Sequence, residues 1–497
     1  MNFSITLKFH SDEKCAFCQE NNNAQLIIQL NDYDSNYSES VSNITFCISH
    51  IFDFSAFELL QNSTLGKYQP LISDILTTLQ MSKNMELESA KNMEFLNLAH
   101  SVNSLIRKKT NIPVVIIAPG PSLSEAIEFL KKNKDVIFSI ALNSAFDACL
   151  DYGYKPDAVF CIESSPAIAS QFKQYSYDNT ILFFDPAMEN STIKKFSGIK
   201  FPVFDFENNL QNLFAYVIDA SHENWKHRAG YSVLTSAIAL ALEITTNNIY
   251  LVGTDLCFTK GFTHDPKSAI SLPIIDNDEL PYKIICYDEI IRETFLAYKL
   301  TAELISTIFQ NEKDKIFSTS KTAAKLTNIK CINLADHAKL FDEVSLRSKS
   351  NFYTQINYTD RSIKYNDKII LKTNEFRNQI IIDIEKINDL TLDKILPVVE
   401  EAKKTNDNEI INQLVSSLNK THIDIFVKSK WSQIYNSLNN QLNLVYGINS
   451  SLTNLQNLPQ HTIAMRLSTY LTISLKNLIQ LKDIVESVIL KIKNGSI

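Results

Sequence analysis

Four potential metal ligands stand in two close pairs near the start of the chain. Cys15 and Cys18 form a C-x2-C pair, and Cys47 and His50 form a C-x2-H pair. Soft and borderline ligands that short turns hold together match the tetrahedral coordination of Zn²⁺. We therefore predict a structural zinc site with all four positions filled and no place for a catalytic water. The long gap between the pairs leaves unrelated thiols beside a surface histidine as the alternative, and the acidic residues in that gap argue against nucleic-acid binding.

His264 and Asp255, in the middle of the chain, are candidates for acid–base chemistry. His264, in the run Phe-Thr-His-Asp, is the best candidate for a general base, because histidine titrates near neutral pH and can take a proton from a hydroxyl group. Asp255, in the run Gly-Thr-Asp-Leu, follows an apolar strand-like run and would orient a ligand hydroxyl or the histidine; helix capping is its alternative role. The segment 265–282 is rich in Pro and Asp, and we expect it to act as a lid.

A possible phosphate-binding turn follows the apolar run 114–118. Gly120, Pro121 and Ser122 lead from this run into a predicted helix, and Ser122 with Glu125 has the spacing of a capping box. A helix N-terminus with a glycine beside it favours an anion such as a nucleotide phosphate. The turn lacks both the G-x-G-x-x-G pattern and a Walker lysine, which disfavours NAD and P-loop chemistry. Plain strand–turn–helix packing is the alternative.

Strands and helices alternate around these residues and must position them. Continuous Val, Ile and Phe runs between helical stretches predict a Rossmann-like α/β domain with a mostly parallel sheet covered on both faces. The predicted strands are 114–118, 136–141, 158–162, 181–184, 203–206, 249–252 and 331–334, and the predicted helices include 123–133, 144–152, 233–245 and 288–309.

The flanks of this domain differ in pattern from its centre. We predict a zinc-knuckle-like segment (1–60), a helical connector (61–110), the Rossmann-like domain (111–345) and an α-helical bundle (346–497). The bundle helices are expected at 371–390, 396–420, 431–455 and 465–493 from apolar residues three and four apart.

The bulk composition is that of an ordinary globular protein. Apolar residues make up 45% and charged residues 21%, and the net charge of -7 gives no general reason to bind nucleic acid. The longest apolar runs are strand-length, and no basic region precedes an apolar stretch at the start, so we expect no membrane partner and a cytoplasmic location. The eight cysteines are then expected to be thiols or metal ligands.

Several motifs, in order, resemble a known superfamily. The run PVVIIAPGPSL (113–123) resembles the turn that opens the motility-accessory-factor and bacterial sialyltransferase families. The similarity continues through SIALNSAFDACLDYGYKPDAVFCIESSP (139–166) and AGYSVLTSAIALALEITTNNIYLVGTDL (229–256), and ends near FTHD (262–265). Archaeal-type 6-hydroxymethylpterin pyrophosphokinases (MptE-like) share the same turn. The resemblance implies a Rossmann-like transferase core.

The resemblance also suggests roles for individual residues. It implies that the donor is bound by Gly120, Pro121, Ser122, Asn143, Glu163, Arg228, Gly230, Ser232 and Gly253. Asn143 has an Asx turn or helix cap as its alternative role, Asp185 is a weaker candidate at a strand end, and Tyr282 or Tyr287 would assist a leaving phosphate. The chain departs from the family pattern at Glu163, where Asp or Asn is usual, and at Tyr231, which replaces a second glycine. It departs again at 334–339, which lacks the T-E-G-G-A element.

Three functions remain open from the sequence. The first is a metal-independent glycosyltransferase that moves a nonulosonic sugar from a CMP-sugar to a protein Ser/Thr or glycan hydroxyl, with flagellin as one candidate acceptor and no catalytic cofactor. The second is an ATP-dependent pyrophosphokinase of the pterin type. The third is a non-catalytic binding protein that keeps the fold.

Overall fold

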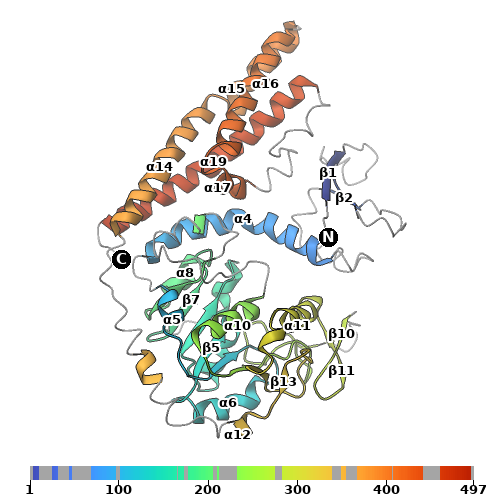
Figure 1. The fold of residues 1–497 in the computed structure, drawn as a ribbon. Coiled ribbons are helices and arrows are strands. Elements are labelled where there is room, and N and C mark those ends of the chain that lie inside the picture. Colours follow the sequence, from blue (N-terminus) through green and yellow to red (C-terminus); the bar gives the residue numbers. More distant parts are fainter. Residues whose placement is uncertain are drawn as a thin grey trace. The chain divides into compact units, whose positions relative to one another are not determined.

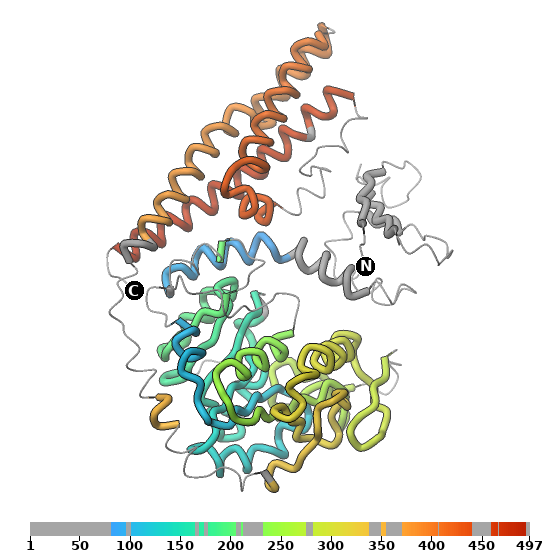
Figure 2. Tube along the Cα trace, viewed as in Figure 1, coloured from blue at the N-terminus to red at the C-terminus, as the bar shows by residue number. Residues whose placement is uncertain are grey.

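The computed structural model describes most of the chain from residue 69 onward. The described ranges are 69–96, 101–164, 166–172, 177–204, 210–211, 232–274, 282–337, 349–353, 366–405, 407–439 and 459–493, together with three strands before residue 50. The chain divides into two compact units, one of Met1–Ala90 and Ile370–Leu490 and the other of Lys91–Ile369 and Lys491–Ile497 (Figures 1 and 2). The finer division into four segments stays a prediction.

The second unit is built on a parallel sheet of eight strands in the order β13-β12-β9-β4-β5-β6-β7-β8. Every neighbouring pair in it is parallel. The strands are β4 (Val114–Ile117), β5 (Phe138–Leu142), β6 (Ala158–Cys161), β7 (Ile181–Phe184), β8 (Lys200–Pro202), β9 (Ile249–Val252), β12 (Ile316–Ser318) and β13 (Lys330–Cys331). The predicted Rossmann-like α/β fold is confirmed.

Helices cover both faces of this sheet (Figure 1). Alternate residues of β4 enter different cores: Val114 and Ile116 join one, and Val115 and Ile117 join the other. The first core includes α5 (Asn103–Ile106), α10 (Val233–Ile244) and α11 (Leu296–Ile308), and the second includes α6 (Leu123–Lys132), α7 (Asn143–Asp151) and α8 (Asn190–Lys194). Both faces are therefore dry, which explains the continuous apolar runs.

Some predicted elements of this unit were wrong. The helix predicted at 288–309 begins only at Leu296, because the preceding residues form a hairpin of β10 (Tyr282–Ile285) and β11 (Ile291–Thr294). The strand predicted at 203–206 lies at β8 instead, and in the run predicted as strand 331–334 only Cys331 is strand, since Leu334 starts α12 (Leu334–His337). The strand predicted at 136–141 is shifted to β5.

The first unit is helical over most of its described length. It contains most of α4 (Gln69–Leu96), followed much later by the helices of the C-terminal region. These are α14 (Asn366–Asn388), α15 (Leu392–Thr405), α16 (Asn408–His422), the π-helix η5 (Ile423–Val427), α17 (Ser432–Leu438) and α19 (Gln460–Lys493). The predicted bundle helix 396–420 is broken in two, and the helix predicted to start at 431 ends at Leu438 in the described part of the chain.

An antiparallel sheet of β1 (Ser4–His10), β2 (Gln25–Asn31) and β3 (Ile44–Cys47) also belongs to the first unit. Among the described helices, none is both long and apolar enough to cross a bilayer.

Candidate functional site

The centre of the candidate site is the point where the order of the sheet reverses. From β4 the chain winds outward in one direction through β5 to β8, and it later returns to pair β9 with the other edge of β4. In open α/β sheets, ligands bind outside the carboxyl ends of the strands at such a point. The loops that follow β4 and β9 carry Gly120 and Asp255, so the fold places both predicted motifs at this edge.

The two loops are locked together through their glycines. The Gly120 N–H donates to the Gly253 carbonyl at 2.7 Å. A Cβ on Gly120 would lie 2.2 Å from Asp255 Oδ2, and one on Gly253, whose φ is +64°, would lie 2.2 Å from the Ala118 carbonyl oxygen. Glycine is therefore required at both positions for the loops to approach this closely.

Asp255 caps helix α6 from a distance of 133 residues in the sequence. Its Oδ2 accepts the Ser122 N–H at 2.8 Å. The predicted capping box is wrong, because Ser122 has α-helical backbone angles and its side chain makes no capping bond. Asp255 is 1% exposed, and its Oδ1 accepts no hydrogen bond of ordinary geometry. Burial raises the pKa of this carboxyl group, although the bond from the Ser122 N–H opposes the rise.

This cap changes how the turn would receive a phosphate. The N–H groups of Gly120, Ser122 and Leu123 donate to Gly253 O, Asp255 Oδ2 and Gly120 O. Pro121 has no N–H to offer. In this conformation the protein's own carboxylate takes the position that an anion would occupy at the helix N-terminus. The phosphate-binding role of Gly120, Pro121 and Ser122 stays a prediction, and it requires Asp255 to be displaced from Ser122.

His264 is held by a hydroxyl group at each ring nitrogen. The Thr263 Oγ1 lies 3.0 Å from Nδ1, and the Tyr298 Oη lies 2.6 Å from Nε2. Burial lowers the pKa of His264 to about 4, opposed by a bond to the Ile270 backbone. Burial also raises the pKa of Tyr298 to about 12. The imidazole is therefore neutral at pH 7 and can accept a proton.

The segment that carries His264 is anchored at the same edge of the sheet. The Asp265 N–H donates to the Pro119 carbonyl at 2.6 Å, which ties this segment to the turn after β4. The fully buried Asp265 carboxylate accepts the Tyr152 hydroxyl of the α7 C-cap at 3.0 Å. Ser268 Oγ donates to the Ser144 carbonyl at 2.9 Å. His264 is thus adjacent in sequence to a residue that contacts the predicted phosphate turn.

Other predicted residues also lie after strands of this sheet. Asn143 begins α7 after β5, and its Nδ2 donates to Gln171 Oε1 at 2.7 Å. Glu163 follows β6, and burial raises the pKa of its carboxyl group. Asp185 follows β7 and accepts the Ala187 N–H and the Gln211 amide, as an Asx turn does. Ser232 caps α10 by accepting the Thr235 N–H at 3.2 Å, so a helix does begin there.

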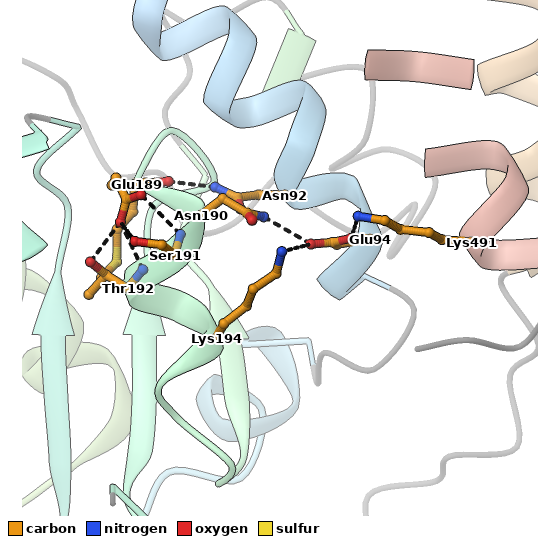
Figure 3. A network of polar contacts seen from close by, with 9 residues as sticks. Asn92, Glu94, Glu189, Asn190, Ser191, Thr192, Lys194 and Lys491 are labelled. Atoms are coloured by element: carbon orange, nitrogen blue, oxygen red, sulfur yellow. Dashed lines mark hydrogen bonds and ion pairs between the residues drawn. The ribbon is translucent and has the colours of Figure 1, made fainter. Parts of the chain in front are cut away.

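The edge near β7 is supported by the last turns of α4 (Figure 3). Asn92 Nδ2 donates to the Pro186 and Met188 carbonyls at 2.7 and 2.5 Å, which holds the segment between β7 and α8. Glu94 is 4% exposed and pairs with Lys194 at 3.3 Å and Lys491 at 2.5 Å. Burial alone would raise the pKa of Glu94, but bonds from Lys491 and Asn190 and the charge of Lys194 hold it below its usual range.

Several predicted residues cannot be placed. Arg228 and Gly230 lie outside the described residues, as do Cys15, Cys18 and His50. Cys47 ends β3, but its side chain is outside the described part, so the zinc site stays a prediction. Tyr287 is placed, and its hydroxyl donates to the Ile329 carbonyl at 2.9 Å; it is committed to the fold and not available to a leaving phosphate.

Comparison with known proteins identifies the central region. The family model described as "6-hydroxymethylpterin diphosphokinase MptE-like" matches residues 88–261. This segment is therefore similar to MptE-like domains. The superfamily predicted from the motifs is thereby confirmed for this part of the chain. The matched residues include β4 to β9, the interlocked glycines and Asp255, whereas His264 and Tyr298 lie just beyond them.

Two further similarities extend past the MptE-like domain. An uncharacterized protein of Treponema pallidum (strain Nichols) is 25% identical over 273 residues, which are 49% of this chain and 46% of that protein. The chain therefore spans about half the length of that relative. The structure is also similar to that of the MAf glycosyltransferase from Magnetospirillum magneticum AMB-1, with a TM-score of 0.40 and 13% identity, over 83% of this chain and 59% of that one. A similarity of this degree does not decide the activity.

Sequence analysis missed two residues of the candidate site, Tyr298 and Gln171. Tyr298, which contacts His264, lies on a stretch predicted as an ordinary helix, and nothing in its spacing relates it to a histidine 34 residues earlier. Gln171, which contacts Asn143, lies on a short 3₁₀ helix that has no apolar periodicity. Only the folded contacts reveal these partners.

Proposed function

We propose that the chain is a glycosyltransferase that moves a nonulosonic, sialic-acid-like sugar from a CMP-sugar to a protein Ser/Thr or glycan hydroxyl. The observation that supports it best is a neutral histidine, His264, anchored at the carboxyl edge of an MptE-like domain beside the turn after β4. Transfer to a hydroxyl needs a group that takes the hydroxyl proton. His264 is unprotonated at pH 7, but a pKa of about 4 makes it a weak base there, so the pKa would have to rise in the complex with the donor. Flagellin is one candidate acceptor.

The acceptor proton would reach His264 through Tyr298. The Thr263 hydroxyl contacts Nδ1 of His264 and also accepts the Leu272 N–H at 3.1 Å. The Tyr298 hydroxyl lies 2.6 Å from Nε2. Both ring nitrogens are therefore covered by hydroxyl groups of the protein, and neither contacts the acceptor substrate directly. Tyr298 gives its proton to Nε2 while it accepts the proton of the acceptor hydroxyl. The acceptor oxygen then forms the bond to the anomeric carbon of the sugar, and the bond from that carbon to the CMP phosphate oxygen breaks.

Asp255 would contribute through Oδ1, which accepts no hydrogen bond of ordinary geometry, although the Ser122 and Ser320 hydroxyl groups favour the charged carboxylate. A buried carboxylate oxygen without a hydrogen bond is costly, and such atoms in native proteins are often completed by a ligand or a water. A donor that binds here would direct a hydroxyl group to Oδ1, while its phosphate competes with Oδ2 for the Ser122 N–H. Positioning and oriented hydrogen bonds would then supply most of the rate without a catalytic metal.

A pterin-type diphosphotransferase is the second candidate, because the family model that matches residues 88–261 carries that description. It too requires a base for a hydroxyl group, so His264 and Tyr298 fit either chemistry. The difference lies in the donor: ATP would leave AMP, whereas a CMP-sugar would leave CMP. A non-catalytic binding protein would release neither nucleotide.

The test measures CMP release from a panel of CMP-activated nonulosonic acids, with ATP-to-AMP conversion in the presence of a hydroxymethylpterin run in parallel. His264→Ala and Tyr298→Phe are each compared with His461→Ala, a histidine on α19 far along the chain from the site. Asp255→Asn retains the shape of the cap and changes only its charge and acceptor capacity.

The proposal expects CMP release that falls at least about a hundredfold in His264→Ala, which is within the range for a lost general base. Tyr298→Phe should lose a comparable share of the CMP release, and His461→Ala should retain full activity. AMP formation that depends on the pterin would replace the proposal with the second candidate. Release of neither nucleotide by a folded protein would favour the binding protein.

A further inference from the structure

Two buried thiols face each other next to the loop that carries Asp255. Cys257 lies on the segment after β9, and Cys286 directly follows β10. Their sulfur atoms are 3.6 Å apart, and the residues are 1% and 0% exposed. Both are free thiols in this structure. Neither was given a role by the sequence motifs, and neither takes part in the proposed transfer.

Backbone bonds hold the two thiols in place. The Phe258 N–H donates to the Glu293 carbonyl at 2.9 Å, and Thr294 Oγ1 donates to the Leu256 carbonyl at 2.7 Å, so β11 is joined to the segment on both sides of Cys257. Cys286 forms an antiparallel bridge with Ala324. A disulfide needs sulfurs about 2.05 Å apart, so the two sulfurs have only about 1.5 Å to close.

The charges around the pair make the two thiols unequal. Arg292 forms a two-pronged ion pair with Asp288, with N–O distances of 2.7 and 2.6 Å. The bond to Cys257 and the Arg292 guanidinium lower the pKa of the Cys286 thiol to about 7, against the effect of burial. The bond to Cys286 and burial raise the pKa of Cys257. Cys286 is therefore the nucleophile of the pair, since the thiolate is the reactive form.

Solvent reaches the neighbourhood of the pair through the ion pair. The Arg292 and Asp288 side chains are 16% and 22% exposed, whereas the sulfurs themselves are enclosed. Because both sulfurs are enclosed, a protein disulfide cannot reach them, and only a small molecule can oxidise the pair. A hydroperoxide is an oxidant of that size.

We propose that Cys257 and Cys286 form a redox modification site at which a hydroperoxide generates a reversible intramolecular disulfide. The Cys286 thiolate attacks one peroxide oxygen, the O–O bond breaks, and the other oxygen leaves as hydroxide, which takes a proton to become water or, from an organic hydroperoxide, the alcohol. The Cys257 sulfur then attacks the Cys286 sulfenic sulfur; the S–S bond forms, and the sulfenic oxygen leaves as water with the Cys257 proton. Two thiols are oxidised, and one peroxide is reduced.

The disulfide would tie the β10–β11 hairpin covalently to the Asp255 loop. Ala324, which pairs with Cys286, also donates its N–H to the Asp255 carbonyl at 2.8 Å. The new bond would therefore stiffen the loop that must move if Asp255 is to release the Ser122 N–H. Oxidation of this pair would therefore restrict the motion of Asp255 although no residue of the candidate site is itself modified.

The experiment treats the reduced full-length chain with hydrogen peroxide at pH 7, blocks the remaining thiols with N-ethylmaleimide, and maps tryptic peptides by mass spectrometry. The proposal expects peptides 229–260 and 284–292 to appear linked, and to separate again with dithiothreitol. The oxidised protein should melt roughly 5 °C or more above the reduced protein, because the link closes a loop of about thirty residues.

Arg292→Gln tests the electrostatic part of the proposal while both cysteines are retained. At pH 7 it should form the link about tenfold more slowly, and the difference should shrink as the pH rises, because a larger share of Cys286 in the variant is then the thiolate. The matched control is Lys325→Gln, which removes an exposed cation paired with Glu289 at 2.6 Å near the same hairpin and should leave the rate unchanged. Absence of the linked pair in the folded protein, or its appearance only in denaturant, would overturn the proposal.

Discussion

At the scale of single residues, the candidate site depends on two glycines more than on any charged group. Gly120 and Gly253 let the loops after β4 and β9 interlock, and only this contact brings Asp255 to the helix it caps. The sequence pointed to Gly120 as a ligand contact. The structure shows that its lack of a side chain is already used by the protein, because Asp255 and Gly253 fill that space.

Gly253→Ala tests this interlock. We expect it to lower the free energy of unfolding by about 3 kcal/mol, because the new methyl group meets a backbone carbonyl and the φ angle is positive. Gly261→Ala is the control: Gly261 has φ +76°, but a Cβ there meets nothing within 4 Å, so it should cost only about 1 kcal/mol. Urea unfolding followed by circular dichroism measures both. Equal losses would show that the strain lies in the backbone angle and not in the contact.

At the scale of elements, the sequence predicts the centre of the sheet better than its edges. The runs at β4, β6, β7 and β9 are continuous and apolar because helices cover both faces, and such runs are visible in the sequence. β12 was missed because it has three residues between polar neighbours. The β10–β11 hairpin was missed because its strands alternate weakly and one end was taken as a helix.

Only those parts of the candidate site that follow directly from the positions of the strands could be predicted from the sequence. Strand ends mark the edge at which Asn143, Glu163 and Asp255 lie, so their placement followed from the strands. Their partners did not, because each comes from a distant segment: Asp255 caps Ser122, and Tyr298 contacts His264. A capping-box pattern looks the same in the sequence whether the serine side chain caps the helix or a carboxylate from a distant segment does so.

One helix was predicted from the sequence where the structure has α15 and α16. The break between them has a local cause that can be tested. Asp407 accepts the N–H groups of Glu409 and Ile410 at 3.0 and 3.2 Å and so starts a new helix. Asp407→Ala should cost about 1 kcal/mol of stability, whereas Asp407→Asn should cost little, since asparagine caps nearly as well. Thermal unfolding of both variants measures this. A matching loss in the asparagine variant would mean that charge, and not capping, carries the effect.

At the scale of the whole molecule, the described part of each compact unit contains a histidine whose surroundings lower its pKa. His264 belongs to one unit and His422 to the other, and burial lowers the pKa of each to about 4. His422 stacks on Phe426, and its Nδ1 has no hydrogen bond in the described structure. In the unfolded chain both would titrate near pH 6.5, so the unfolded state binds more protons than the folded state between pH 6.5 and 4.

The stability of the protein should therefore fall as the pH drops from 6.5 toward 4, and the loss should stop below the folded pKa. The two histidines would each contribute a loss of about 2 kcal/mol between pH 8 and pH 5. Carboxyl groups with a lowered pKa, such as Glu94 and Glu189, lose their contribution as the pH falls through the unfolded value near 4.5. Asp255, whose pKa is raised, acts in the opposite direction above its unfolded value. The share of each histidine is therefore obtained by comparing variants across the same pH range and not from the pH range alone.

His422→Phe separates one histidine from the rest, because phenylalanine retains the ring contacts and cannot be protonated. Urea unfolding at pH 5, 6, 7 and 8 should show about 2 kcal/mol less dependence on pH than in the unaltered protein, while His461→Gln serves as the control. His264→Gln should remove a similar share of the pH dependence. The double variant should remove both shares, because the two residues belong to different compact units and their effects should add. An unchanged slope in His422→Phe would mean that this ring is already protonated or solvated in the folded state, and that the low-pH loss has another source.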